Sequence, residues 1–453
     1  MASVDLRELS SPEVHSYYGA VLDRIEAVDP AVAAFLPEVD RRGRVLAEAK
    51  RLTDRYADTP PAAKPPLFGL PLGVKDLFNV EGFATRAGSR LPPELFAGPE
   101  ASAVTRLKRA GAIVLGKTVT TEFAYFSPGP TRNPWHLDHT PGGSSSGSAA
   151  AVAAGMALVA IGTQTIGSVN RPAAFCGVVG YKPSYGRAPI DGVVSFSHSS
   201  DHVGLFAPDV ATVTAAAEVL CDLEAPAPNR PGGSRGFETG DLDAVRSEWT
   251  GVPPGTHFVR CRGPYEAQAD AEAQEAVDRV VEVLLARAGR GASTAVVELD
   301  LLPDIDKVNT SHQLLIAREF AEVHKTWSAA YGDLYSPKSR ELVEKGRSVD
   351  EPAYRSAKHL GGRLRNRINQ ALGEGGVIVS PSAPGIAPSG IDTTGSPIMN
   401  LPWTYAGLPT VTLPVMVTKS GLPVAVQLVG QFGADSALLQ TATAVEAAID
   451  FRP

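Results

Sequence analysis

Residues 141–177 read PGGSSSGSAAAVAAGMALVAIGTQTIGSVNRPAAFCG, and this stretch constrains the fold more strongly than any other in the chain. Two loops of small and hydroxyl residues, GGSSSGS and TQTIGSVNRP, enclose a run rich in alanine. Alanine is the best helix former because it loses no side-chain entropy, so residues 149–160 are expected to form a buried helix or a helix running into a strand. The loops at its two ends would then present backbone amides and serine hydroxyls together, as a nucleophile beside an oxyanion hole requires.

The motifs GGSSSGSAAAVAAG and GTQTIGSVNRPAAFCGVVGYKPS resemble the Gly/Ser-rich signature of the amidase signature family. Within that family they look most similar to malonamidase-like members, which share the TQT and the arginine three residues after the nucleophile. The resemblance implies that Ser168 is the nucleophile and that Ser144 is the bridging serine, in a cis peptide. It also implies a lysine inside a GxPxxxKD-type segment, and GLPLGVKDLF places that lysine at Lys75.

This Ser-Ser-Lys arrangement meets the chemical needs of a serine nucleophile. A serine hydroxyl is a weak nucleophile without a base, and a lysine can serve as that base only when it is neutral. The apolar flanks of Lys75 predict the burial that lowers a lysine pKa. Ser144 would relay the proton from Ser168 to Lys75, and the predicted oxyanion hole consists of backbone N–H groups, those of Thr165, Ile166, Gly167 and Ser168.

Two departures from the family pattern concern the substrate. The family usually has glycine at the position of Ile166, and many members have arginine at the position of Asn170. Arg171 instead resembles the malonamidase arrangement, in which that arginine binds a substrate carboxylate, although pairing with a structural acid is an equal alternative. The aromatic, turn-rich segment 120–140 is expected to line an entrance. We predict substrate contacts for Arg171, Asn170 and Tyr125.

Two motifs suggest rival enzyme classes. GAIVLGKT at 111–118 matches the phosphate-binding pattern GxxxxGK[ST], but its four intervening residues read as a strand, whereas a phosphate cradle needs a loop of exposed amides. The segment 143–147 matches the GxSxG elbow of α/β-hydrolases with Ser145 at its centre. That elbow must follow a strand, and here it follows a turn. Both matches are therefore interpreted as coincidental.

Two histidine pairs could in principle bind metal. His136 and His139 lie near Asp138, and His198 and His202 occur in HSSDH. Neither pair has a complete ligand set close in sequence, and the second lacks the glutamate of HExxH. We expect no metal and no cofactor.

Composition restricts partners and location. A net charge of −7 without a Lys/Arg run argues against a nucleic-acid-binding surface. Three scattered cysteines, Cys176, Cys221 and Cys261, are too few for a disulfide framework or a metal cluster. The beginning of the chain lacks the pattern of a secretory signal, and the longest apolar run is too short to span a bilayer. We expect a soluble cytoplasmic protein without a membrane partner, and a homodimer is left open.

The resemblance extends from about residue 15 to about residue 446 and favours one domain over the whole of 1–453. Its parts are N-terminal helices at 1–65, a signature core at 66–223, a variable helical substrate region at 224–375 and a C-terminal segment at 376–453 in which the chain returns to the sheet. The implied α/β fold is a large mixed sheet sandwiched between helices in three layers, α/β/α. Phe320, His324, Trp327 and Tyr331 of the variable region are either pocket walls or core residues.

Local patterns predict individual elements. A surface connection is expected at 224–254, and strands at 112–115 and around Lys75. Further strands are expected in TAVVELDL at 294–301 and in three runs at 375–384, 408–415 and 422–430. Helices are expected at 11–25, 37–56, 101–110 and 205–223, at 273–284 with Gly289 as its end, and between 306 and 373.

The sequence therefore predicts an amidase that hydrolyses a C–N bond of a small linear amide through an acyl-enzyme. The alternatives are a urethane, carbamate or ester hydrolase with the same triad, and the amidase component of a glutamyl-tRNA amidotransferase-like complex. The small amide-type substrate itself is not defined by the motifs.

Overall fold

The computed structural model describes residues 5–223, 251–287 and 296–451. All strands of these ranges lie in one mixed sheet of ten strands, in the order β2-β1-β3-β5-β4-β9-β10-β8-β6-β7. The pairs β1/β2, β1/β3, β6/β7 and β6/β8 are parallel, and the other neighbours are antiparallel. The strands are β1 (Pro71–Lys75), β2 (Ile113–Thr118), β3 (Val159–Gln164), β4 (Val179–Lys182), β5 (His202–Ala207), β6 (His257–Cys261), β7 (Val296–Leu299), β8 (Gly376–Pro381), β9 (Thr410–Val417) and β10 (Pro423–Val429).

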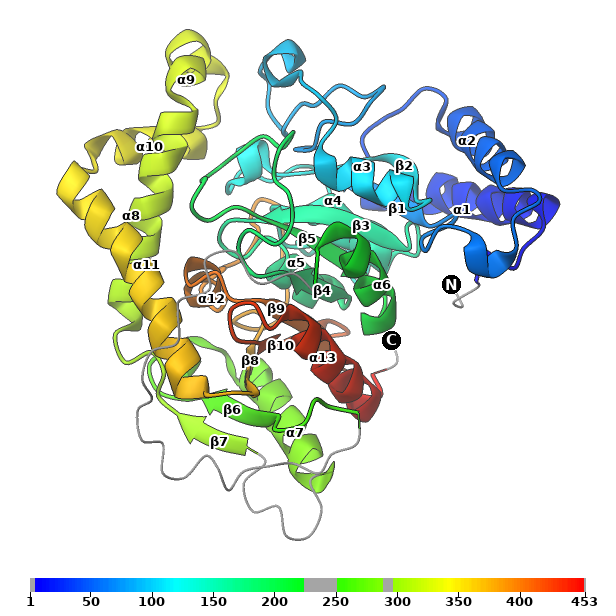
Figure 1. Cartoon of the computed structure of the whole chain (residues 1–453). Helices are drawn as coiled ribbons and strands as arrows, with labels where there is room; N and C mark the ends of the chain where they lie inside the picture. The colour runs from blue at the N-terminus through cyan, green and yellow to red at the C-terminus, as the bar shows by residue number, and fades with distance from the viewer. Residues whose placement is uncertain (1–4, 224–250, 288–295, 452–453) are drawn as a thin grey trace.

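Helices flank this sheet and give the expected α/β/α layering (Figure 1). They are α1 (Ser11–Val32), α2 (Arg41–Arg55), α3 (Ser102–Arg109), α4 (Ser146–Ala153), α5 (Asn170–Cys176), α6 (Val210–Leu220), α7 (Ala271–Arg287), α8 (Ile305–Val323), α9 (Lys325–Tyr331), α10 (Pro337–Ser348), α11 (Glu351–Leu372), α12 (Leu401–Tyr405) and α13 (Asp435–Ile449). Figure 1 shows α1 and α2 at one end of the molecule and α8 to α11 grouped at the other.

The alternation of β3 shows why helices are needed on both faces of the sheet. Ala160 packs into an apolar cluster with residues of α4 and α5, whereas Val159 and Ile161 belong to the main core with residues of α6 and α13. Successive side chains of a strand point to opposite faces, so both faces of this strand are apolar and buried. The same alternation places Gly73 and Lys75 of β1 on the α4 side, since a Cβ on Gly73 would contact Ala160.

Several element predictions are confirmed and several are corrected. The run 149–160 is a helix running into a strand, because α4 ends at Ala153 and β3 begins at Val159. The predicted helix 205–223 is wrong at its start. Residues 202–207 form β5, and Pro208 with the capping residue Asp209 begins α6 only afterwards. A short apolar run is compatible with either structure, and here pairing with β3 and β4 decides for a strand.

Sequence reasoning also missed two short strands, β4 and β6. The predicted helix at 11–25 is α1, which has Ser10 as its N-cap and extends to Val32. The predicted connection at 224–254 and the helix end at Gly289 lie mostly or wholly outside the described residues. None of the described helices combines the length and apolarity needed to cross a bilayer. The division into one domain with four parts stays a prediction.

Candidate active site

Lys75 ends β1 and is fully buried, as its apolar flanks indicated. Its Nζ donates hydrogen bonds to three hydroxyl oxygens, those of Ser144 at 2.7 Å, Ser145 at 2.9 Å and Thr163 at 2.8 Å. Burial lowers the pKa of Lys75 well below its ordinary value, and the charge of Asp201 opposes that shift. Lys75 is therefore suited to be a neutral base that exchanges protons with neighbouring hydroxyls.

Ser144 follows a cis peptide bond from Gly143, as the family resemblance implied, and it is 2% exposed. The segment before it is held close to α5. Gly142 has a φ of 79°, and a Cβ there would lie 2.9 Å from Cα of Pro172. Glycine is therefore required at this position both by the left-handed backbone and by the close approach.

Ser168 lies in the loop that joins β3 to α5 and is 6% exposed, which makes it the most exposed of the three predicted triad residues. In the structure as described, the side-chain hydrogen bonds of the triad connect Lys75 with Ser144, and none joins Ser168 to Ser144. Hydrogen bonds at catalytic serines are often long or absent without substrate. The hydroxyl of Ser168 is thus free to approach a substrate carbonyl.

Arg171 fixes the position of the Ser168 loop relative to Ser144. Its guanidinium, 2% exposed, donates to the Gly143 carbonyl at 2.5 Å, to the Gly395 carbonyl at 2.8 Å and to the Thr394 hydroxyl at 3.3 Å. Burial lowers the pKa of Arg171 to about 9. Within the described chain no carboxylate pairs with it, so the alternative of a structural acid partner finds no support. Its Nε is buried and has no partner there.

The loop 165–168 differs in how its carbonyls and its amides are bonded. Two of its carbonyls are occupied, since Thr404 donates to the Ile166 carbonyl at 2.7 Å and the Arg171 amide donates to the Gly167 carbonyl at 3.0 Å. Its own amides, from Thr165 to Ser168, donate no hydrogen bond within the part of the chain that is described. Unoccupied amides of this kind can bind an oxyanion.

Ile166 occupies the position where the family usually has glycine. Its φ is not positive, since Ile166 is not among the described non-glycine residues with positive φ. Its side chain is buried and packs with the main hydrophobic core. The β-branched residue therefore contributes to the core, and its backbone stays in the ordinary region.

Asn170 has structural partners. Its Oδ1 accepts from Gln164 at 2.8 Å and from Thr410 at 3.0 Å, and its Nδ2 donates to Thr412 at 3.0 Å. This network is fully buried. Because these bonds occupy the amide, the predicted contact of Asn170 with substrate is not supported by its geometry.

Tyr125 lines a cavity of about 310 Å³ next to the triad. The other lining residues are Phe126, Lys338, Glu341, Thr393 and Thr394. This cavity touches the Arg171 site, since Arg171 bonds to Thr394 and lies 5.7 Å from the ring centre of Phe126. Two aromatic residues of the predicted entrance segment 120–140, Tyr125 and Phe126, therefore line a cavity beside Arg171.

The two rival enzyme motifs have structural roles. Residues 113–118 of GAIVLGKT form β2, and Lys117 is buried in an ion pair of 2.8 Å with Asp76. Ser145 of the GxSxG match is 0% exposed and hydrogen-bonds to Lys75 and to the carbonyl of Thr163. A serine enclosed in this way cannot act as an exposed nucleophile.

The histidines have separate partners. His139 contacts the Ala387 carbonyl at 2.8 Å, His198 lies 3.1 Å from Glu319, and His202 is buried against the Ser200 carbonyl. Among the residues that the structure describes, no group of three or more metal-ligating side chains comes together.

Two of the proposed pocket-wall residues are core residues. Phe320 and His324 are fully buried and stack on each other with ring centres 3.9 Å apart. Trp327 and Tyr331 pack only partly buried against the same core. The helical region therefore covers the site mainly with α10, which carries Lys338 and Glu341.

Sequence reasoning missed Ser145 and Thr163 as partners of Lys75. The run of three serines at 144–146 was a usable signal for the first. Thr163 carried no signal, since only its place on β3, next to β1, brings it to the lysine.

Comparisons with known proteins agree with this architecture. A profile of the Amidase family matches residues 18–439. A glutamyl-tRNA(Gln) amidotransferase subunit of Synechococcus sp. is 33% identical, and the alignment covers 98% of this chain and 95% of the relative. A crystal structure of an amidase superposes with a TM-score of 0.81 at 30% identity and covers 98% of both chains. The peptide amidase of Stenotrophomonas maltophilia gives a TM-score of 0.75 at 27% identity, covering 99% of this chain and 96% of that one.

The chain belongs to the amidase family, and it is a hydrolase of the type that acts on C–N bonds. The predicted fold is confirmed. The comparisons do not single out malonamidase-like members, because relatives that are 33% identical over nearly the whole chain are subunits of glutamyl-tRNA(Gln) amidotransferases.

Proposed function

We propose that this protein hydrolyses the C–N bond of a small carboxamide through an acyl-enzyme on Ser168. The observation that carries the proposal is the contact of 2.7 Å between Lys75 Nζ and Ser144 Oγ in a fully buried setting. Burial favours the neutral amine, so Lys75 can accept a proton from Ser144 while Ser144 takes one from Ser168.

The reaction then proceeds in two stages. Ser168 Oγ attacks the carbonyl carbon, and the oxyanion accepts hydrogen bonds from amides of the loop 165–168. Lys75 returns the proton through Ser144 to the leaving nitrogen, and the C–N bond breaks to leave an ester on Ser168. Water, deprotonated along the same path, attacks this ester and releases the acid. No step requires a metal or cofactor.

The surroundings of the Arg171 guanidinium favour a substrate that carries a carboxylate. A buried guanidinium that bonds, within the described chain, only to neutral oxygens lacks the anionic partner that buried charges usually have. A substrate carboxylate in the adjoining cavity would supply it, and Tyr125 lines that cavity. Amides of small dicarboxylic acids are therefore the preferred substrate class.

The test is the release of ammonia from a panel of malonamate, glutamine, acetamide and benzamide, with a carbamate and an ester included. A fluorophosphonate should label Ser168, and Ser168→Ala should release no ammonia. For Arg171→Ala, KM for malonamate should rise at least about tenfold more than KM for acetamide, since a charge-assisted contact with the substrate carboxylate is lost. Equal losses for both would assign Arg171 a structural role, and a label on another serine would contradict the mechanism.

A second candidate is the amidase component of an amidotransferase complex. The curated relatives favour it, since several glutamyl-tRNA(Gln) amidotransferase subunits match nearly the whole chain at 31–33% identity. An amidotransferase passes the nitrogen to an acceptor, so the isolated chain would release little ammonia until partner chains are added. Turnover of the panel by the purified chain alone would decide for the free-standing amidase. A cytoplasmic location and a homodimer stay predictions.

A further inference from the structure

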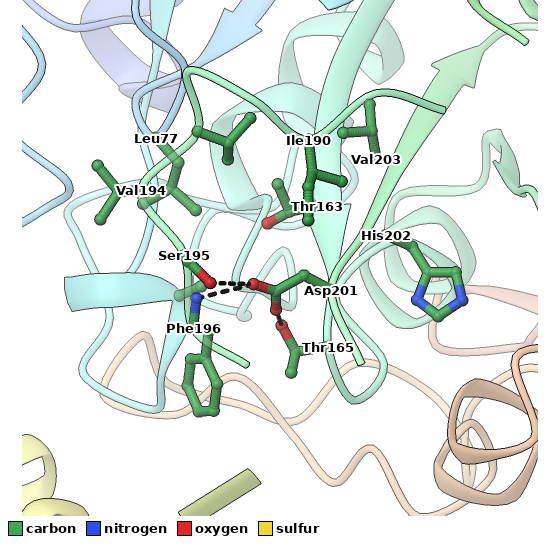
Figure 2. Close-up of a pocket in the computed structure, with 12 residues that line it drawn as sticks. Leu77, Thr163, Thr165, Ile190, Val194, Ser195, Phe196, Asp201, His202 and Val203 are labelled. Carbon is green, nitrogen blue, oxygen red and sulfur yellow. Dashed lines mark hydrogen bonds between the residues drawn. The ribbon is translucent and has the colours of Figure 1, made fainter. Parts of the chain in front are cut away.

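A carboxylate lies next to the triad without being part of it. Asp201, directly before β5, accepts hydrogen bonds from Thr165 Oγ1 at 2.6 Å, Ser195 Oγ at 2.9 Å, and the amides of Phe196 at 2.9 Å and Ser197 at 3.0 Å. Figure 2 shows this arrangement, with Thr165 on one side of the carboxylate and the 195–196 segment on the other. These four donors favour the ionised form of the Asp201 carboxylate, whereas burial acts against it and raises the pKa of this group.

Asp201 reaches the proposed oxyanion hole through Thr165. Thr165 is the first residue of the loop 165–168, and its hydroxyl is held by the carboxylate at 2.6 Å. Loss of this bond would remove the side-chain anchor at the start of the loop, which would then be held by the hydrogen bonds to the Ile166 and Gly167 carbonyls further along.

Asp201 also acts on the base. Burial lowers the pKa of Lys75, and the Asp201 carboxylate is the charge that opposes this shift. Thr163, a hydrogen-bond partner of Lys75, lines the same small cavity as Thr165 and Asp201 (Figure 2). The cavity measures about 10 Å³, which is at most the room for one water, so it cannot hold a substrate.

We propose that Asp201 is a positioning residue for the reaction, which holds the oxyanion loop through Thr165 and places its carboxylate at the small cavity that Thr163, a hydrogen-bond partner of Lys75, also lines. The proposal rests on the function proposed above for Ser168. Asp201 does not touch the reacting atoms, since the lining of its cavity includes neither Ser144 nor Ser168.

The other titratable groups near this site have partners of their own. His202 contacts the carbonyls of Ser200 and Gln164, and Lys182 donates to the carbonyl of Leu408. Glu319 of α8 accepts from Ser197 and Ser199, and the hydroxyl of Tyr185 donates to the carbonyl of His198. On the other face of β1, Asp76 pairs with Lys117. These contacts leave Asp201 as the carboxylate that acts on Lys75.

The experiment measures how fast a fluorophosphonate labels Ser168 in the full chain, between about pH 5 and about pH 10. This probe reports activation of the serine without knowledge of the substrate. For Asp201→Asn we expect labelling about tenfold slower or more at high pH, and an acid limb moved to lower pH by about half a unit or more. The direction follows because loss of a nearby negative charge lowers the pKa of a lysine, so the neutral amine persists to lower pH.

A matched control is Asp435→Asn. Asp435 is a fully buried carboxylate that likewise accepts hydrogen bonds, from Tyr181 at 2.8 Å and the Ser184 amide at 2.7 Å, but it begins α13. Its variant should melt at a lower temperature without moving the acid limb. A purely structural role for Asp201 predicts the same behaviour for Asp201→Asn, and that result would overturn the proposal.

If Asp201→Asn does not fold, Thr165→Val provides a second test of the positioning role. It removes the hydroxyl but retains the backbone amide, so labelling should slow about fivefold or more while the acid limb stays in place. Wild-type labelling by folded Thr165→Val would overturn the positioning role. Absence of any label on wild-type Ser168 would contradict the proposed function instead, which separates the two failures.

Discussion

Two buried lysines on neighbouring strands have opposite surroundings. In the parallel register of β1 and β2, Val74 pairs with Lys117 and Lys75 pairs with Thr118, so the two lysine side chains point to opposite faces of the sheet. Lys117 forms an ion pair with Asp76 at 2.8 Å and donates to the Phe78 carbonyl. Lys75 instead donates to three hydroxyls.

This difference separates a structural lysine from a candidate base. Burial lowers the pKa of both lysines. The adjacent Asp76 carboxylate opposes this shift for Lys117. For Lys75 the opposing charge is that of Asp201, which is not one of its three hydrogen-bond partners. Hydroxyl groups can transfer protons to and from a lysine amine, whereas a carboxylate stabilises the charged form of the lysine. The face of the sheet, not the residue type, therefore decides the role.

The largest expected effect is a loss of activity when the candidate base, Lys75, is removed. Lys75→Ala should reduce kcat/KM on the order of 10³-fold or more at every pH, because no base remains for the serines. Measured rates on the amide panel check this, with circular dichroism as a test of folding. Lys117→Ala with a comparable loss in a fully folded protein would contradict the division of roles.

On the structural side we expect a loss of stability. Lys117→Met leaves Asp76 buried and unpaired, which should lower the free energy of unfolding by about 3–5 kcal/mol. Urea denaturation measures this effect. The double variant with Asp76→Asn should recover part of the loss, and no recovery would mean that the ion pair is not the cause.

The pH dependence sharpens the contrast. The folded-state pKa of Lys75 lies below its unfolded value, so the neutral base forms as pH rises through that lowered pKa. The wild-type kcat/KM should therefore rise toward alkaline pH along a single limb. A bell-shaped profile governed by a group that titrates like free histidine would disagree with this mechanism.

The smallest effect concerns a third buried lysine. Among the described residues, Lys182 donates only to the carbonyls of Leu408 and Pro183, and burial lowers its pKa to about 7. The unfolded state then binds more protons between about pH 7 and about pH 10, so this group makes stability rise with pH over that range. Lys182→Met should flatten that rise and change kcat/KM less than about threefold. An unchanged slope would show that Lys182 stays charged when folded.

Much of the site could be predicted from local sequence. The segment 141–177 contains Ser144 and Ser168, and GLPLGVKDLF contains Lys75. The small residues of these motifs allow the backbone to pack closely around a hydroxyl group. The continuous apolar runs of β8, β9 and β10 likewise predicted buried strands, because burial on both faces of a strand leaves no polar alternation.

Other features depended on contacts between distant segments. The sequence did not show that Lys75 and Lys117 lie on opposite faces of the sheet, because strand register decides this. It also did not show whether Arg171 pairs with the Gly143 carbonyl or with an acid, because the approach of α5 to residue 143 decides that. For the same reason the sequence did not show that Asn170 is held by structural partners or that Thr163 contacts Lys75. The apolar residues from 205 onward predicted a helix, and the pairing of β5 with β3 and β4 makes residues 202–207 a strand instead. Residue type and spacing determine which groups the chain can offer. Only the tertiary structure determines which of them share a buried space, and desolvation and hydrogen bonding there set their chemistry.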